Sequence, residues 1–320
     1  MTLLSTAVPG STFSPVSASR RFKNGLATTL VWLAFGVALI PLVWLLWTVV
    51  GKGYHAIFDA SWWSSDQAGV SNTTPGGGAL AAIVGTAEQV AVCTLISVPI
   101  ALLLGVYLVE YGRGPLARVA TFMVDILTGI PSIVAALFIY ALFVTTFGGH
   151  RAGWLVSLAL VILMIPVIVR TTEEMLRLVP NELREASYAL GVPKWKTVLR
   201  VVIPTAFTGL LTGIVLGIAR VAGETAPLLI LVGYSSYTNW NPFGGSQASL
   251  PGFINYQFIN INTSSGKGAY HLDANGNKVF GAVANYAPDR AWGAALTLII
   301  IVMALNLFAR LISRRNKVAS

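Results

Sequence analysis

Six apolar runs, each long enough to cross a lipid bilayer, dominate this sequence of 320 residues. A helix needs about 20 mostly apolar residues to span the hydrocarbon core. Charged residues make up 10% of the chain, whereas soluble domains contain about a quarter. The apolar runs lie at residues 26–50, 79–109, 115–146, 152–170, 205–233 and 291–312. We therefore predict an all-α polytopic membrane protein with six transmembrane helices.

The second, third and fifth runs are longer than a bilayer requires, so we expect tilted or kinked helices in these places. The third run contains Pro131 within the segment GIPSIV. A proline inside a helix removes a backbone hydrogen bond and bends the helix axis. The sequence thus predicts a kink at Pro131.

Basic residues indicate how the chain is oriented in the membrane. Lysines and arginines gather before the first run, between the second and third, between the fourth and fifth, and after the sixth. The alternate segments contain only Lys52, Arg151, Lys267, Lys278 and Arg290. Because basic loops tend to stay in the cytoplasm, we expect an inner-membrane protein with both termini in the cytoplasm.

The same pattern predicts the organisation of the chain. Residues 1–24 form a disordered cytoplasmic tail, since the first part of this segment is rich in Ser, Thr and Pro. Residues 25–313 form the transmembrane domain, and residues 314–320 form a second cytoplasmic tail. Two connections are long, residues 171–204 on the cytoplasmic side and residues 234–290 outside.

The fifth run carries two charged residues, Arg220 and Glu224, four positions apart. At about 100° per residue, both fall on one side of a continuous helix, together with Gly209, Gly213 and Gly217. Glycines spaced in this way let a second helix approach closely. We therefore assign the three glycines to helix packing.

The cost of placing a charge inside a membrane is at least about 2.5–3.5 kcal/mol on insertion scales, which makes Arg220 and Glu224 functional candidates. The guanidinium fork of an arginine suits a tetrahedral oxyanion, and a neighbouring glutamate would orient that fork. We predict that both residues line a substrate pathway near the middle of the fifth helix. The alternative is an ion pair that only pins two helices together.

The basic loop between the fourth and fifth runs has the pattern of two short helices joined by a tight turn. Gly191 can adopt the left-handed conformation that ends a helix, and Pro193 suits the first turn of the next. Before the turn, Glu185, Ala186 and Ser187 place a carboxylate and small side chains on a helix suited to docking. The alternative is an amphipathic helix that lies on anionic lipid.

These loop residues resemble the EAA loop of bacterial ABC importer permeases, whose pattern is E-A-A-x3-G-x9-I-x-L-P. The chain has Ser187 at the third position and Ile203-Pro204 at the end, with small departures at Ser187, Val201 and Ile203. The segments GVYLVEYGRG, VDILTGIPSIVAALFIY and IARVAGETAPLL extend the resemblance to phosphate importer permeases. It covers about residues 76–235 and the last run, but neither the N-terminal tail nor residues 262–288.

The resemblance implies a permease that forms half of a heterodimeric pathway for inorganic phosphate. It implies a homologous PstC-like permease, two PstB-like ATPase subunits that use ATP-Mg, and an extracytoplasmic PstS-like phosphate-binding protein. It also implies that the loop couples the permease to the ATPase. The residues it assigns to this coupling are Glu185, Ala186, Ser187, Gly191, Pro193 and Pro204.

The sequence contains no motif for catalysis in this chain. An ATPase phosphate loop needs G-x4-G-K-[ST], and the nearest segment, SSGKG, lacks both the upstream glycine and the following hydroxyl. We predict a non-catalytic membrane subunit with no metal or cofactor of its own and no nucleic-acid partner. The alternative function is an ion-coupled secondary anion transporter or channel, although we find no internal repeat of the kind such proteins often carry.

Overall fold

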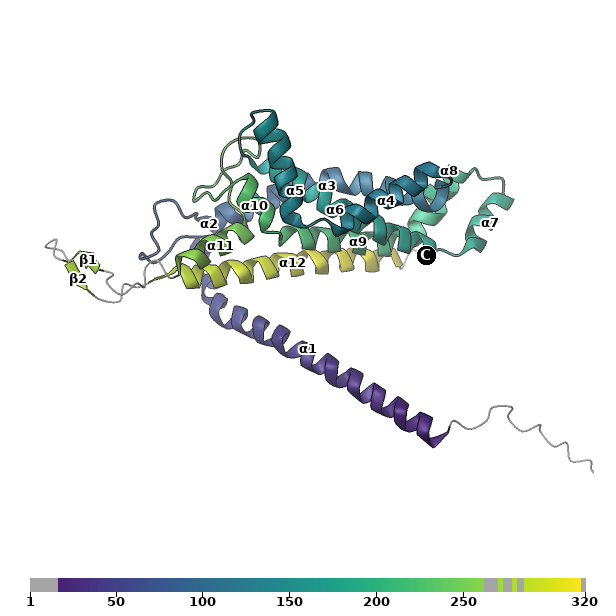
Figure 1. Ribbon diagram of the computed structural model, residues 1–320, viewed down its shortest axis with the longest axis horizontal. Helices are drawn as coiled ribbons and strands as arrows, with labels where there is room; N and C mark the ends of the chain where they lie inside the picture. Colours follow the sequence, from purple (N-terminus) through teal and green to yellow (C-terminus); the bar gives the residue numbers. More distant parts are fainter. Residues whose placement is uncertain (1–16, 262–269, 273–277, 281–284, 318–320) are drawn as a thin grey trace, which may run out of the picture. The chain divides into compact units, whose positions relative to one another are not determined.

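The computed structural model describes residues 17–261, 270–272, 278–280 and 285–317. A short antiparallel pair of strands, β1 (Tyr270–Leu272) and β2 (Lys278–Phe280), is the one sheet among these residues, which are otherwise helical or in loops (Figure 1). Within the described residues, five helices are long and apolar enough to span a membrane, and a bent pair of helices is a sixth candidate. The predicted all-α membrane architecture is confirmed.

The chain divides into two compact units, residues 1–51 and residues 52–320. Helix α1 (Ala18–Phe58) supplies the described helix of the first unit and continues into the start of the second. Helix α1 begins at Ala18, so the prediction of a disordered tail is wrong for residues 18–24. The helix begins earlier because Oγ of Ser17 accepts a hydrogen bond from the amide of Arg20 at 3.4 Å and caps the first turn. The rest of the predicted tail lies outside the described residues.

Helix α6 (Gly153–Arg177) is the centre of the second unit, since 67% of its most apolar stretch is buried. Leu155, Leu160 and Met164 on this helix are at most 2% exposed. A helix that is apolar on all sides is either surrounded by protein or faces lipid in a membrane. The helices that pack on α6 are α3 (Leu80–Val106), α4 (Pro115–Gly129), α5 (Ser132–Ile139), α9 (Ile203–Ala222) and α10 (Ala226–Leu231).

The third apolar run is broken into two helices rather than kinked. Helices α4 and α5 meet at an angle of 106° beside Pro131. Ile130 is extended, with φ −72° and ψ 125°, because the residue before a proline avoids the helical conformation. The π-helical segment η2 (Tyr140–Thr146) continues α5. The sequence thus predicted the position of the bend but not its size.

The fifth run begins and ends earlier than predicted. A continuous helical rod, Lys194–Ala222, is formed by α8 (Lys194–Thr197), the π-helical segment η3 (Val198–Val202) and α9. The wider π turn accommodates Pro204, which has no N–H to donate. The rod ends at Ala222 because Gly223 is a weak helix former and Pro227 cannot donate to its carbonyl.

The glycine-rich face of α9 packs directly on α6. A Cβ added to Gly213 would lie 2.4 Å from Cγ2 and 2.7 Å from Cβ of Thr171. One added to Gly209 would lie 2.2 Å from Sδ of Met175, and one added to Gly217 would lie 3.2 Å from the nearest α6 side-chain atom. Because a threonine Cβ is fixed to the backbone while a methionine can change rotamer, the contact at Gly213 is the least adaptable.

Gly213→Ala is expected to lower the stability of the purified protein more than Gly209→Ala. Overpacking costs about 1–3 kcal/mol, whereas exchanging glycine for alanine inside a helix gains about 1 kcal/mol. Thermal unfolding in detergent measures the difference. Gly36→Ala is the control, because an added Cβ there meets nothing within 4 Å. Equal unfolding temperatures for the two α9 variants would contradict this account of the packing.

The two ends of the second unit carry different structures (Figure 1). Helices α7 (Asn181–Ala189) and α8 lie at one end, and α2 (Ala60–Ser64) and α11 (Leu250–Asn260) lie at the other. Near α2 a second core contains Trp62 and Phe253, and Nε1 of Trp62 donates to Oγ1 of Thr297 at 2.9 Å on helix α12 (Ala287–Lys317). This packing joins α2, α11 and α12 at one end of the unit.

Candidate coupling loop and pathway residues

The loop after α6 forms the helix–turn–helix that the sequence predicted. Helix α7 ends before Gly191, which has φ +74°. This left-handed conformation is open to glycine without a steric cost, and the Gly191 amide donates to the Tyr188 carbonyl at 2.9 Å. Pro193 is the N-cap of α8, one position before its first helical residue. The left-handed turn at Gly191 is confirmed.

The three residues before the turn do not share one surface. Glu185 and Ala186 are exposed. Ser187 is only 8% exposed, and its Oγ lies 2.8 Å from Oγ1 of Thr197 on α8. The small side chain of Ser187 therefore packs inside the helix–turn–helix and does not share the exposed surface of Glu185 and Ala186.

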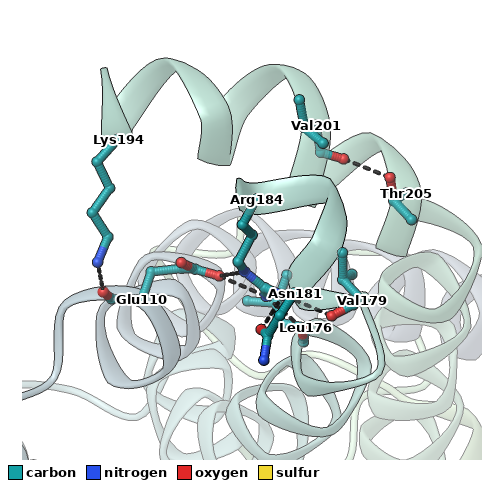
Figure 2. A network of polar contacts seen from close by, with 8 residues as sticks. All are labelled: Glu110, Leu176, Val179, Asn181, Arg184, Lys194, Val201 and Thr205. Atoms are coloured by element: carbon teal, nitrogen blue, oxygen red, sulfur yellow. Dashed lines mark hydrogen bonds and ion pairs between the residues drawn. The ribbon is translucent and has the colours of Figure 1, made fainter. Parts of the chain in front are cut away.

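Arg184 holds α7 against the ends of two long helices (Figure 2). Its Nη2 and Nε donate to Oε1 of Glu110 at 2.8 and 3.1 Å. Glu110 lies in η1 (Tyr107–Tyr111), the π-helical end of α3. The same guanidinium donates to the carbonyls of Leu176 at 2.9 Å and Val179 at 2.6 Å, at the end of α6. The Arg184 and Glu110 side chains are 13% and 5% exposed, so solvent screens this ion pair little.

Lys194 contacts the same end of α3 from the other side of the turn (Figure 2). Its ammonium donates to the backbone carbonyl of Glu110 and lies 4.9 Å from the ring centre of Tyr111. Sequence analysis missed this network. The available signal was a carboxylate placed at the end of an apolar run, which needs a partner if it is buried.

Arg220 and Glu224 do not form the pair that a continuous helix predicts. Arg220 lies in the last turn of α9, whereas Glu224 follows the helix end at Gly223. Arg220 is exposed, Glu224 is partly buried, and among the described residues no ion pair joins the two. The prediction that both lie near the middle of one helix is wrong, since the segment GETAP breaks it. A cation in the last turn is itself stabilised by the helix dipole, by about 0.3–1 kcal/mol.

A second polar network fixes the loop before α11. Nε2 of Gln89, on α3, donates to Oε1 of Gln247 at 2.9 Å, and Nε2 of Gln247 donates to Glu88. The Oγ of Ser157 on α6 donates to the Gln89 carbonyl at 3.1 Å. Gln89 and Gln247 are 2% and 1% exposed. These contacts hold the loop between α3 and α6.

An ion-pair cluster joins α4 to α6 on the side of Pro131 that precedes the bend. Arg170 donates to Asp125 on α4 and, through Nη1, to Oε2 of Glu173 at 2.6 Å. Asp125 is exposed and Glu173 is buried. The cluster therefore fixes α4 relative to the central helix.

Residues 97–317 match the family described as binding-protein-dependent transport system inner membrane component. The chain is 50% identical over 300 residues to phosphate transport system permease protein PstA 1 of Mycobacterium tuberculosis, covering 94% of this chain and 91% of that protein. It is 49% identical to PstA of Mycobacterium leprae, covering 92% and 90%. It is 39% identical to PstA of Pasteurella multocida, covering 91% and 95%.

Two solved structures share the fold at low sequence identity. The MetNI methionine ABC transporter in an inward-facing conformation matches with a TM-score of 0.53 and 21% identity, covering 72% of this chain and 93% of that chain. A bacterial alginate ABC transporter in complex with its periplasmic protein matches with a TM-score of 0.59 and 14% identity, covering 89% and 94%. The chain belongs to the binding-protein-dependent transport system inner membrane component family, among the permease proteins named PstA.

Proposed function

We propose that this chain is the PstA permease subunit of an ATP-driven ABC importer for inorganic phosphate. The observation that carries the proposal is 49–50% identity, over more than nine-tenths of the chain, to proteins named phosphate transport system permease PstA. The fold supports a transport role, because candidate membrane spans pack around one buried helix, α6. The chain acts in the inner membrane as a non-catalytic subunit.

The proposal includes partners on both sides of the membrane. A homologous PstC-like permease completes the pathway, a PstS-like protein delivers phosphate from outside, and two PstB-like subunits hydrolyse ATP-Mg in the cytoplasm. Helix α7 supports ATPase docking, because it lies at one end of the second unit and exposes Glu185 and Ala186. Gly191 and Pro193 set the angle between α7 and α8. Pro204 lies further along the helical rod, in the first turn of α9.

Arg220 and Glu224 are the proposed pathway residues. Arg220 is exposed in this chain, so its guanidinium is free to face a pathway that a second permease completes. Glu224 lies on the short connection between α9 and α10, where it tempers the positive charge without a fixed ion pair. A transport site must bind its ion weakly enough to release it, and a neighbouring carboxylate weakens the attraction between Arg220 and an anion.

Reconstitution in proteoliposomes tests the proposed function. Radiolabelled phosphate uptake is expected only when the chain is present with its permease, ATPase and binding-protein partners and with hydrolysable ATP on the ATPase side. Uptake by the chain alone, driven by an ion gradient, would support a secondary transporter instead. ATP-dependent uptake of another solute in preference to phosphate would contradict the proposed substrate.

The proposed topology, with both termini in the cytoplasm, predicts which loops an impermeant thiol reagent reaches. Tyr237 is 64% exposed before α11, and Leu190 is 83% exposed beside Gly191. In a Cys93→Ala background, Tyr237→Cys is expected to react in intact cells whose outer barrier has been permeabilised, whereas Leu190→Cys should react only in inverted vesicles. The opposite pattern of labelling would reverse the topology.

A further inference from the structure

Glu110 is held from both arms of the helix–turn–helix (Figure 2). Arg184 on α7 binds its carboxylate, and Lys194 at the start of α8 binds its backbone carbonyl. Glu110 itself belongs to the π-helical end of α3, a helix that packs closely on the central helix α6. Both arms of the loop are therefore tied to the end of α3 through the same residue.

We propose that Glu110 and Arg184 are positioning residues that transmit movement of α7 to α3 and α6 during transport. The inference rests on the proposed function, in which α7 meets an ATPase. Arg184 is suited to this task because one guanidinium has several donors in a fixed plane. It contacts the end of α3 through Glu110, α6 through the carbonyl of Leu176, and the connection after α6 through the carbonyl of Val179. Displacement of α7 therefore acts on both helices through one side chain.

Apolar packing under the loop stabilises the fold, which leaves the polar contacts to fix the orientation of α7. Leu176, Val179 and Val202 are at most 4% exposed and form a core cluster between the end of α6 and the helical rod. That cluster buries apolar surface but is non-directional. The buried ion pair adds direction, because its hydrogen bonds are short only in one orientation of α7. Weakening the ion pair should therefore reduce the transmission of movement from α7 more than it reduces the stability of the fold.

The test compares two conservative variants with a matched control. Arg184→Lys keeps the positive charge but cannot reach the carboxylate and both carbonyls at once. Glu110→Gln keeps an acceptor oxygen but removes the negative charge. Arg118→Gln is the control, because Arg118 is exposed on α4 and lies outside the loop. Phosphate import and ATP hydrolysis are measured on the same proteoliposomes, which contain all partner subunits.

The expected result is a fall in phosphate imported per ATP hydrolysed, by about 2- to 30-fold, the range for residues that couple two sites. Arg118→Gln should leave this ratio at the wild-type value. An unchanged ratio in Arg184→Lys and Glu110→Gln would overturn the proposal, as would loss of the assembled complex in both variants, which indicates a role in assembly alone. Failure of the wild-type complex to import phosphate would instead overturn the proposed function.

Discussion

Arg220→Gln is expected to abolish phosphate import by a complex that still assembles. The substitution removes the positive charge and the planar fork together, while glutamine keeps a similar length and remains tolerated in a helix. Because Arg220 is exposed and joins no ion pair among the described residues, its loss should disturb the fold of this chain little. Uptake normalised to assembled complex is the measurement.

Companion variants separate the pathway role from a purely structural one. If bidentate geometry matters, Arg220→Lys should restore import poorly, whereas a helix-dipole role requires only a cation and predicts full restoration. Glu224→Gln should slow turnover more than it reduces assembly. Near-normal import by assembled Arg220→Gln would refute the pathway assignment for Arg220.

Local sequence rules predicted much of the fold because they depend on neighbouring residues alone. The apolar runs predicted the candidate spans, and Pro131 predicted the break between α4 and α5. The same rule applied to Pro227 would have predicted a break shortly before residue 227 and so separated Arg220 from Glu224. Treating residues 205–233 as one helix instead gave Arg220 and Glu224 a shared face that they do not have.

The contacts that hold the candidate coupling loop depend on tertiary structure, and sequence patterns do not contain them. Arg184 and Glu110 are 74 positions apart, so no local pattern identifies one as the partner of the other. Helical periodicity alone likewise cannot say that Ser187 meets Thr197 on α8. Gly191 was predicted correctly, because a helix end followed by proline is a local signal.

Gly191→Val is expected to reduce phosphate import by about 5- to 30-fold while the protein still inserts into the membrane. The left-handed conformation costs about 1–2 kcal/mol for residues with a Cβ, which changes a conformational population by that factor. An added Cβ at Gly191 meets nothing within 4 Å. The effect therefore arises from the backbone angle between α7 and α8 and not from a clash.

Two further variants show whether that angle matters specifically for ATPase coupling. Gly191→Asn should retain most import, because asparagine tolerates the left-handed region better than valine. Gly148→Val imposes the same conformational conflict elsewhere, since Gly148 has φ +67° and open space around its Cβ; it should leave phosphate imported per ATP unchanged. Import at the wild-type level by Gly191→Val with its ATPase attached would mean that the α7–α8 turn does not set ATPase docking. A matching loss in Gly148→Val would trace the effect to general destabilisation, because only Gly191 joins the two arms that hold Glu110.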